Sequence, residues 1–229
     1  MGKILIAAAY GAFVVFLIRF LAYWLIWRKT VTVMRLGKTA QTVRPSVKAF
    51  ALTVMDVTFF GRLLMVNPVL WVGEWVFHVS FLLVLLRHLR LFLNPVPSCI
   101  WWVQTPGLIA GYFLPFSLAY ILLVRLLSKR ERYASPANVF LLALVLVISS
   151  LGVVMHGLFK PNLVDVKLFV LGILSFTPAS LPESTLFAIH FSLVLVLIPL
   201  LPTHIFFAPI VMMEARKREQ ALHLVMHEK

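Results

Sequence analysis

Five long apolar runs, separated by more polar stretches, dominate the pattern of the chain. They occupy roughly residues 4–27, 69–93, 107–127, 139–158 and 185–208. Each run is close to the about 20 apolar residues that an α-helix needs to cross the hydrocarbon core of a bilayer. The pattern therefore predicts an all-α integral membrane protein, built as a five-transmembrane-helix bundle. No internal repeat is evident, so we expect a single domain that covers residues 1–229.

Two further segments are apolar but are not typical of membrane spans. Residues 47–66 are interrupted by three charged side chains, which favours an amphipathic helix at the cytoplasmic interface. Residues 166–184 are apolar, but the stretch before Pro178 is too short to cross a bilayer. We expect this second segment to lie along the outer surface, where it could cap a site.

The composition supports a membrane protein. Hydrophobic residues make up 62% of the chain and charged residues 13%, whereas a soluble protein has about 25% charged residues. The formal net charge of +13 would suggest a nucleic-acid partner in a soluble protein. Here most of the 21 Lys and Arg residues lie in the stretches between the apolar runs. Topology explains them better, and no nucleic-acid partner is expected.

The basic residues also orient the helices. Most of them follow the first, third or fifth run, and the loops richest in Lys and Arg are the cytoplasmic ones. We therefore expect the N-terminus outside and the C-terminus in the cytoplasm. The predicted location is the cell (inner) membrane, which the chain crosses several times, with membrane lipid around it.

Cysteine usage excludes several kinds of metal centre. Cys99 is the one cysteine, so the chain cannot form an internal disulfide, a Cys-rich zinc site or an iron–sulfur site by itself. The C-x-x-C-H signature of covalent c-type haem attachment is also missing. Any resident redox group must use other ligands.

Histidines inside the apolar runs are the candidate ligands. Five of the 7 histidines lie in or at the edge of a run, where an ionisable residue is costly and is a functional hypothesis by default. The structural alternative is a neutral imidazole that bonds to a neighbouring helix. Four of the five form a pattern: His78 and His88 are ten residues apart on the second run, and His190 and His204 are fourteen apart on the fifth.

The two pairs match when the helices are packed antiparallel. At 1.5 Å per residue, ten residues rise about 15 Å and fourteen about 21 Å, and each pair lies broadly on one side of its helix. Antiparallel packing brings His88 opposite His190, and His78 opposite His204. Facing neutral imidazoles at two depths suit two bis-histidine haems b. Zinc would need three or four ligands at one point, which this spacing does not allow.

Three stretches carry a resemblance to a known family. They are FHVSFLLVLLRHLRLFLNPVP (77–97), VKLFVLGILSFTPAS (166–180) and IHFSLVLVLIPLLPTHIFFAP (189–209). With this layout the chain resembles the gamma-subunit family of respiratory nitrate reductases, which are five-helix di-haem cytochromes b, and their relatives in heterodisulfide-reductase-type membrane complexes. The fourteen-residue spacing looks most like the cytochrome b associated with sulfite reduction. The chain lacks the lysine that a nitrate reductase gamma subunit has between Asn94 and Gly107.

The resemblance implies a function in a respiratory chain of sulfur metabolism. It implies that His88 and His190 ligate the iron of an outer haem, and His78 and His204 that of an inner one. The chain would be the electron-transfer subunit of a quinone-linked oxidoreductase, between the menaquinone pool and a cytoplasmic-side iron–sulfur subunit of the heterodisulfide-reductase type. Further membrane or periplasmic redox subunits would complete the complex.

Two alternatives remain open at this stage. One is the gamma subunit of a nitrate reductase. The other belongs to a different class, a transporter that uses its histidines for proton coupling and binds no haem. Proton relays usually rely on carboxylates, and Glu74 is the main carboxylate within the runs.

Four polar residues are candidate contacts for a quinone or for haem propionates. His156 lies near the outer end of the fourth run, and a quinol gives up protons on oxidation, so a nearby base is useful. Arg87 and Arg90 flank His88 and could bind carboxylates or extend to the headgroups. Lys167 belongs to residues 166–184. We expect the quinone beside the outer haem, because the basic cytoplasmic loops would be the docking surface of the partner.

Overall fold

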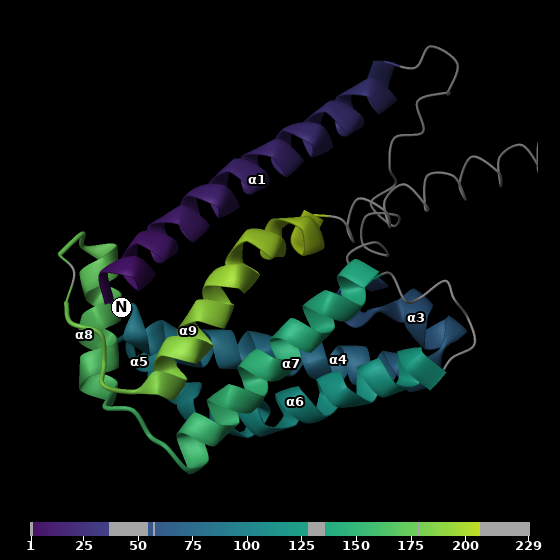
Figure 1. Ribbon diagram of the computed structural model, residues 1–229. Coiled ribbons are helices and arrows are strands. Elements are labelled where there is room, and N and C mark those ends of the chain that lie inside the picture. The colour runs from purple at the N-terminus through teal and green to yellow at the C-terminus, as the bar shows by residue number, and fades with distance from the viewer. Residues whose placement is uncertain (1, 37–54, 57, 128–135, 178, 207–229) are drawn as a thin grey trace, which may run out of the picture. The chain divides into compact units, whose positions relative to one another are not determined.

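The computed structural model describes residues 2–36, 55–56, 58–127, 136–177 and 179–206 (Figure 1). Their regular structure is entirely helical, and no β-strand occurs among them. The elements are α1 (Gly2–Leu36), α3 (Gly61–Val66), α4 (Pro68–His88), η1 (Leu89–Leu91), α5 (Ser98–Trp102), α6 (Gln104–Leu127), α7 (Pro136–Gly157), α8 (Leu163–Leu174), α9 (Thr185–Leu197) and η3 (Ile198–Leu200). Much of the basic charge that predicts a cytoplasmic docking surface lies outside these described residues.

Five helices are long and apolar enough to cross a membrane. They are Gly2–Ile26, Pro68–Leu91, Gln104–Leu127, Pro136–Gly157 and Thr185–Phe206. These bounds confirm the five predicted spans to within a few residues at each end. The side of the membrane on which each terminus lies stays a prediction.

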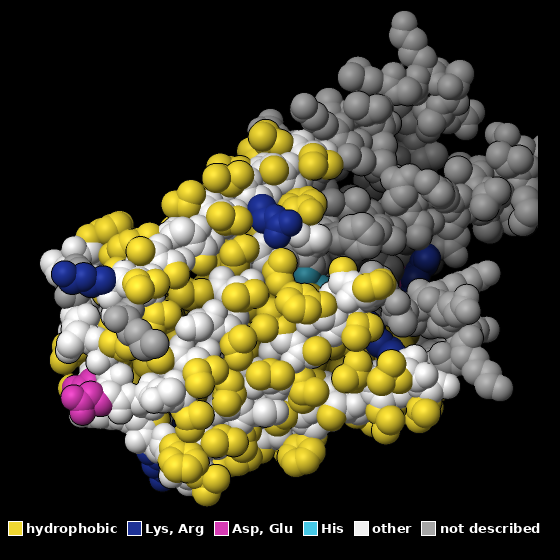
Figure 2. All heavy atoms as spheres, viewed as in Figure 1, with side chains coloured by type: hydrophobic (Ala, Val, Ile, Leu, Met, Phe, Trp, Pro, Cys, Tyr) yellow, Lys and Arg dark blue, Asp and Glu magenta, His cyan; other side chains and the backbone are white. Residues whose placement is uncertain are grey.

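The surface of the molecule is apolar where a soluble protein would be polar. Large apolar side chains such as Phe13, Phe116 and Phe140 are more than half exposed, and hydrophobic side chains are spread over the described part of the face seen in Figure 2. A soluble monomer rarely exposes such extensive apolar surface. Lipid is therefore the solvent that fits this surface.

The chain forms two compact units, which we describe separately. The first comprises Met1–Ala12 and Asn67–Ile198, and the second comprises Phe13–Val66 and Pro199–Lys229. In the first unit α4 packs most extensively on α6, α6 packs on α7, and α7 packs on α9. In the second unit the guanidinium of Arg19 on α1 donates to the backbone oxygen of Pro199, at 2.9 Å.

Three helices of the first unit, α4, α8 and α9, begin at side-chain caps. The Asn67 side chain accepts a hydrogen bond from the backbone N–H of Leu70, and Pro68 occupies the first helical position of α4. Asn162 caps α8 and Ser184 caps α9 in the same manner. Such caps satisfy N–H groups that have no partner within the helix.

The segment between α7 and α9 packs one face into the protein. Its helix α8 buries Val166, Phe169 and Val170, and the predicted position of residues 166–184 along the outer surface of the membrane stays a prediction. Phe169 is fully buried, in a cluster with Met155 and Phe187. The first turns of α1 join this packing, because the Tyr10 hydroxyl donates to the backbone oxygen of Ile173 at 3.0 Å.

The prediction of one amphipathic helix over residues 47–66 is wrong where it can be checked. Residues 47–54 and 57 lie outside the described residues. Phe60 has a φ of 52°, a left-handed conformation that cannot continue an α-helix. The short helix α3 begins only after this break.

Two glycines allow α4 and α6 to approach closely. A Cβ added at Gly107 on α6 would lie 2.9 Å from the backbone oxygen of Leu83 and 2.8 Å from Cβ of Arg87, both on α4. A Cβ added at Gly73 on α4 would lie 2.7 Å from the ring of Tyr120 on α6. Small residues at such contacts are a common means of packing helices in membranes. The α4–α6 pair is thus held close at both of its ends.

Replacing Gly107 by alanine should therefore destabilise the protein. The new methyl group meets backbone atoms that cannot move aside, and overpacking of this kind costs about 1–3 kcal/mol. The matched control is Gly111→Ala on the same helix, where the nearest atom is Cγ2 of Val84 at 3.8 Å. Thermal unfolding of both variants in detergent would show a lower Tm for Gly107→Ala only. Equal Tm values would contradict the close contact.

Candidate functional site

The two histidines of α4 have the same local hydrogen bond. Nδ1 of His78 lies 2.7 Å from the backbone oxygen of Glu74, and Nδ1 of His88 lies 2.7 Å from that of Val84. A backbone oxygen can only accept, so each Nδ1 carries the hydrogen. In the neutral ring the lone pair is then on Nε2. Both histidines thus present Nε2 as a possible ligand, and each ring is held by the preceding turn of its own helix.

His88 and His190 come together in the first unit. The His88 side chain is exposed. The ring of His190 on α9 is close enough that a charge on either imidazole would act on the other. Their helices are not a closely packed pair, because α4 rests on α6 and α9 rests on α7. The two rings therefore approach each other from separate helices.

One ring nitrogen of His190, Nδ1, is a buried polar atom with no hydrogen-bond partner in the described part of the chain. The ring lies against α7, with Cε1 3.7 Å from the position of a Cβ at Gly152, and near the backbone of Ile148. A buried unsatisfied polar group costs about 1–3 kcal/mol and calls for an explanation.

His204 belongs to the second compact unit and His78 to the first. His204 is exposed there, in the helical segment 201–206 that follows η3. The pairing of these two histidines stays a prediction from the sequence. No three His, Cys, Asp or Glu side chains converge as a metal site anywhere in the described ranges.

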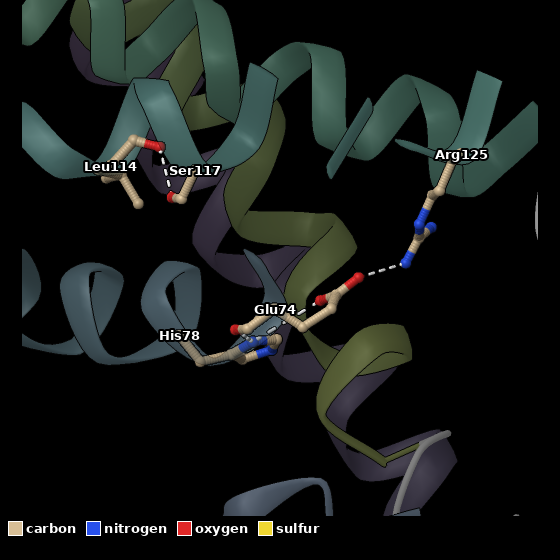
Figure 3. A network of polar contacts seen from close by, with 5 residues as sticks. All are labelled: Glu74, His78, Leu114, Ser117 and Arg125. Carbon is tan, nitrogen blue, oxygen red and sulfur yellow. Dashed lines mark hydrogen bonds and ion pairs between the residues drawn. The ribbon is translucent and has the colours of Figure 1, made fainter. Parts of the chain in front are cut away.

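A buried ion pair adjoins His78. Glu74 on α4 is only 8% exposed, and its carboxylate accepts a hydrogen bond from the guanidinium of Arg125 on α6 at 2.6 Å. The second carboxylate oxygen lies 3.9 Å from Nδ1 of His78. Figure 3 shows Glu74 between the imidazole and the guanidinium. In the sequence, Arg125 is one of the basic residues near the end of the third run, where it indicates topology.

The sequence carries a signal for the pairing of Glu74 with Arg125. Glu74 lies near the start of the second run and Arg125 near the end of the third. Consecutive spans run antiparallel, so these two positions fall at the same depth. Opposite charges at one depth in neighbouring spans are expected to pair.

A second polar cluster lies near the other end of α4. The Tyr112 hydroxyl on α6 is 3.1 Å from Nδ1 of His156 on α7. The guanidinium groups of Arg87 and Arg90 are near enough to act on His156 electrostatically, as is Lys160. Three of the four predicted quinone contacts thus lie together. Tyr112 was missed because a tyrosine near a span end usually belongs to the interfacial aromatic belt.

The two arginines of this cluster are held differently. Arg90 donates to the side-chain oxygen of Gln104 at 2.9 Å, and Gln104 donates to the backbone oxygen of Ile100 at 3.0 Å. Arg87 has a buried Nε with no hydrogen-bond partner among the described residues. Lys167, the fourth predicted contact, lies on α8 and is partly buried. Its participation stays a prediction.

The chain is similar to two curated proteins named "Hdr-like menaquinol oxidoreductase cytochrome b-like subunit". It is 33% identical to the one from Archaeoglobus profundus over 150 residues, which cover 58% of this chain and 44% of that protein. It is 33% identical to the one from Archaeoglobus fulgidus over 149 residues, which cover 58% of this chain and 45% of that protein. The chain thus spans less than half the length of these relatives. No protein-family model and no solved structure matches it.

Loss of Arg125 alone should be more harmful than loss of the whole ion pair. Arg125→Met leaves the buried Glu74 carboxylate without its partner, which costs about 3–5 kcal/mol when a buried pair is broken. Replacing both residues by Met removes the unpaired charge, and most of the stability should return. Unfolding in detergent measures both variants. A double variant as unstable as the single one would contradict a buried pair.

Proposed function

We propose that this chain is a membrane cytochrome b subunit with two haems b, which transfers electrons between the menaquinone pool and an iron–sulfur partner. The observation that carries the proposal is the repeated arrangement on α4. His78 and His88, ten residues apart, each bond their own helix through Nδ1, so Nε2 is the nitrogen that we propose binds iron. This is the arrangement that an axial haem ligand needs, with the second nitrogen fixing the ring. The names of the two relatives agree with it.

His88 and His190 fit the first haem. Neutral imidazoles are common axial ligands of haem iron, and these two approach each other from helices that do not pack closely together. Ligation of iron would also change the orientation of the His190 ring and so account for the Nδ1 that has no partner among the described residues. A rotated ring could place one nitrogen on iron and turn the other toward the backbone of Ile148.

His78 and His204 are the proposed ligands of the second haem. The matched spacing on the second and fifth spans supports this pair, and the fixed ring of His78 fits the role. Haem b supplies one-electron transfer, while the protein positions it and adjusts its potential. We place the haem of His88 and His190 on the outer side of the membrane and that of His78 and His204 on the inner side.

The quinone site is proposed beside the outer haem. The residues are His156, Tyr112, Arg87 and Arg90, with Lys167 as a further contact. The tyrosine hydroxyl and His156 can each donate or accept a hydrogen bond, so this pair can take a proton from a bound quinol and pass it on. The arginines supply donors for the quinone oxygens and for haem propionates.

The remaining features of the proposal concern the complex. The "Hdr-like" name of the relatives favours an iron–sulfur subunit of the heterodisulfide-reductase type, docked on the cytoplasmic side of the cell membrane. Further membrane or periplasmic redox subunits would accompany it. A sulfite-reduction complex is proposed because the histidine spacing on the fifth span looks most like that cytochrome b. Proteins that co-purify with the full chain test this assignment.

Single alanine variants test the ligands. His88→Ala and His190→Ala should lose the same haem, and His78→Ala and His204→Ala the other, because each iron needs both imidazoles. The pyridine haemochrome assay on purified protein should give two haems b in the unchanged chain and one in each variant. His156→Ala is the control and should keep both. Loss of the same haem in the His78 and His190 variants would show that the pairing is wrong.

A second prediction tests the quinone site. Tyr112→Phe and His156→Ala should slow haem reduction by a menaquinol analogue at least about tenfold, since a positioned acid–base group contributes typically 10²–10⁴-fold. Both haems should stay bound. Tyr120→Phe is the matched control, because Tyr120 lies on the same helix but donates to the backbone oxygen of Val69. Stopped-flow reduction that is equally fast in all variants would overturn this placement.

A further inference from the structure

Glu74 is a charged group in a place where charge is costly. It lies in the second span, its side chain is nearly inaccessible, and it is the main carboxylate within the spans. A buried ion pair is often no more stable than well-packed apolar residues of similar size. Its contribution to stability therefore does not explain why a carboxylate stands there. Its neighbours suggest a role in the site.

Glu74 contacts His78 in two ways. Its backbone oxygen accepts the hydrogen of Nδ1 at 2.7 Å, and its carboxylate lies 3.9 Å from the same nitrogen. Both contacts are with the nitrogen opposite the proposed iron-binding one. In metal sites, an acceptor at that nitrogen orients the ring and makes the imidazole a stronger electron donor.

The turn of α4 that bears Glu74 is fixed to α6 at three points. The Tyr120 hydroxyl donates to the backbone oxygen of Val69 at 2.9 Å. Gly73 lies in direct contact with the Tyr120 ring. Arg125 binds the carboxylate of Glu74 itself at 2.6 Å. The carboxylate and the backbone oxygen that face His78 therefore have defined positions.

The other histidine of α4 has no such partner. The residue four positions before His88 is Val84, which offers only its backbone oxygen. The charges near His88 are the guanidinium groups of Arg87 and Arg90, which are positive. One helix thus places a carboxylate beside one proposed ligand and cations beside the other.

We propose that Glu74, held by Arg125, is a positioning residue for the His78 ligand, and that its carboxylate lowers the reduction potential of the haem that His78 binds. This inference rests on the proposed haem ligation by His78. A nearby negative charge stabilises the ferric haem, which carries one more positive charge than the ferrous form. The carboxylate lies between Arg125 and the imidazole (Figure 3), so the negative charge is nearer the ring than the positive one.

The test is a spectroelectrochemical titration of the purified full chain with both haems bound. Glu74→Gln removes the charge but keeps the backbone oxygen and an acceptor for Arg125. In Glu74→Gln, the midpoint potential should rise for the haem that the His78→Ala variant loses. The expected rise is about 59 mV, which for one electron corresponds to a tenfold change in the ratio of oxidised to reduced haem. The other haem should be unchanged. Glu74→Asp keeps the charge and should restore most of the original potential.

Two comparisons make the result decisive. Asp165→Asn removes an exposed carboxylate from the first turn of α8 and should shift neither potential. An unchanged potential in Glu74→Gln, or an equal shift of both haems, would overturn the inference and leave the haem ligation standing. If Glu74→Gln does not retain the haem, the double replacement of Glu74 and Arg125 by Met decides, because it removes the carboxylate without leaving its partner unpaired. An unaltered potential of that haem in the double variant counts against the role. Retention of both haems by His78→Ala would instead refute the ligation itself.

Discussion

The hydrocarbon core of a membrane offers no hydrogen bonds, so every polar group in a span must find its partner within the protein. This constraint explains most of the polar contacts described above. His78 and His88 bond the preceding turn of α4, and Arg90 bonds Gln104. Arg19 reaches the backbone oxygen of Pro199 in the second unit. Among the described residues, three buried side-chain nitrogens have no hydrogen-bond partner, and Nδ1 of His190 is the one that belongs to a proposed haem ligand.

The close packing of α4 on α6 gives these polar groups their positions. Gly73 and Gly107 bring the helices together, and the Glu74–Arg125 pair and the Tyr120 hydroxyl join them at one end. A proposed ligand on α4 therefore stands on a helix that packs extensively on its neighbour α6. α9 rests on α7 rather than on α4. One proposed ligand of each haem thus comes from a helix anchored on α6, and its partner comes from α9 or the segment after it.

The sequence predicts the spans well and the contacts between them poorly, for physical reasons. Bilayer thickness sets the length and hydropathy of each span, so the five runs agree with the helices to within a few residues. The break at Phe60 depends on one backbone angle, and the hydropathy pattern carries no information about single backbone angles. Tyr112 with His156, and Glu74 with Arg125, depend on the rotation and register of neighbouring helices. The histidine spacing singled out His88 and His190, whose proximity the sequence could only infer from antiparallel packing.

The central claim is that two haems are each held by two imidazoles of this chain. Low-temperature electron paramagnetic resonance of the oxidised, purified full chain tests it most directly, because the spectrum of ferric haem reports the spin state that the axial ligands impose. The account predicts two low-spin ferric species of the bis-imidazole type, in equal amounts. A high-spin ferric haem, a single low-spin species or a protein without haem would contradict it.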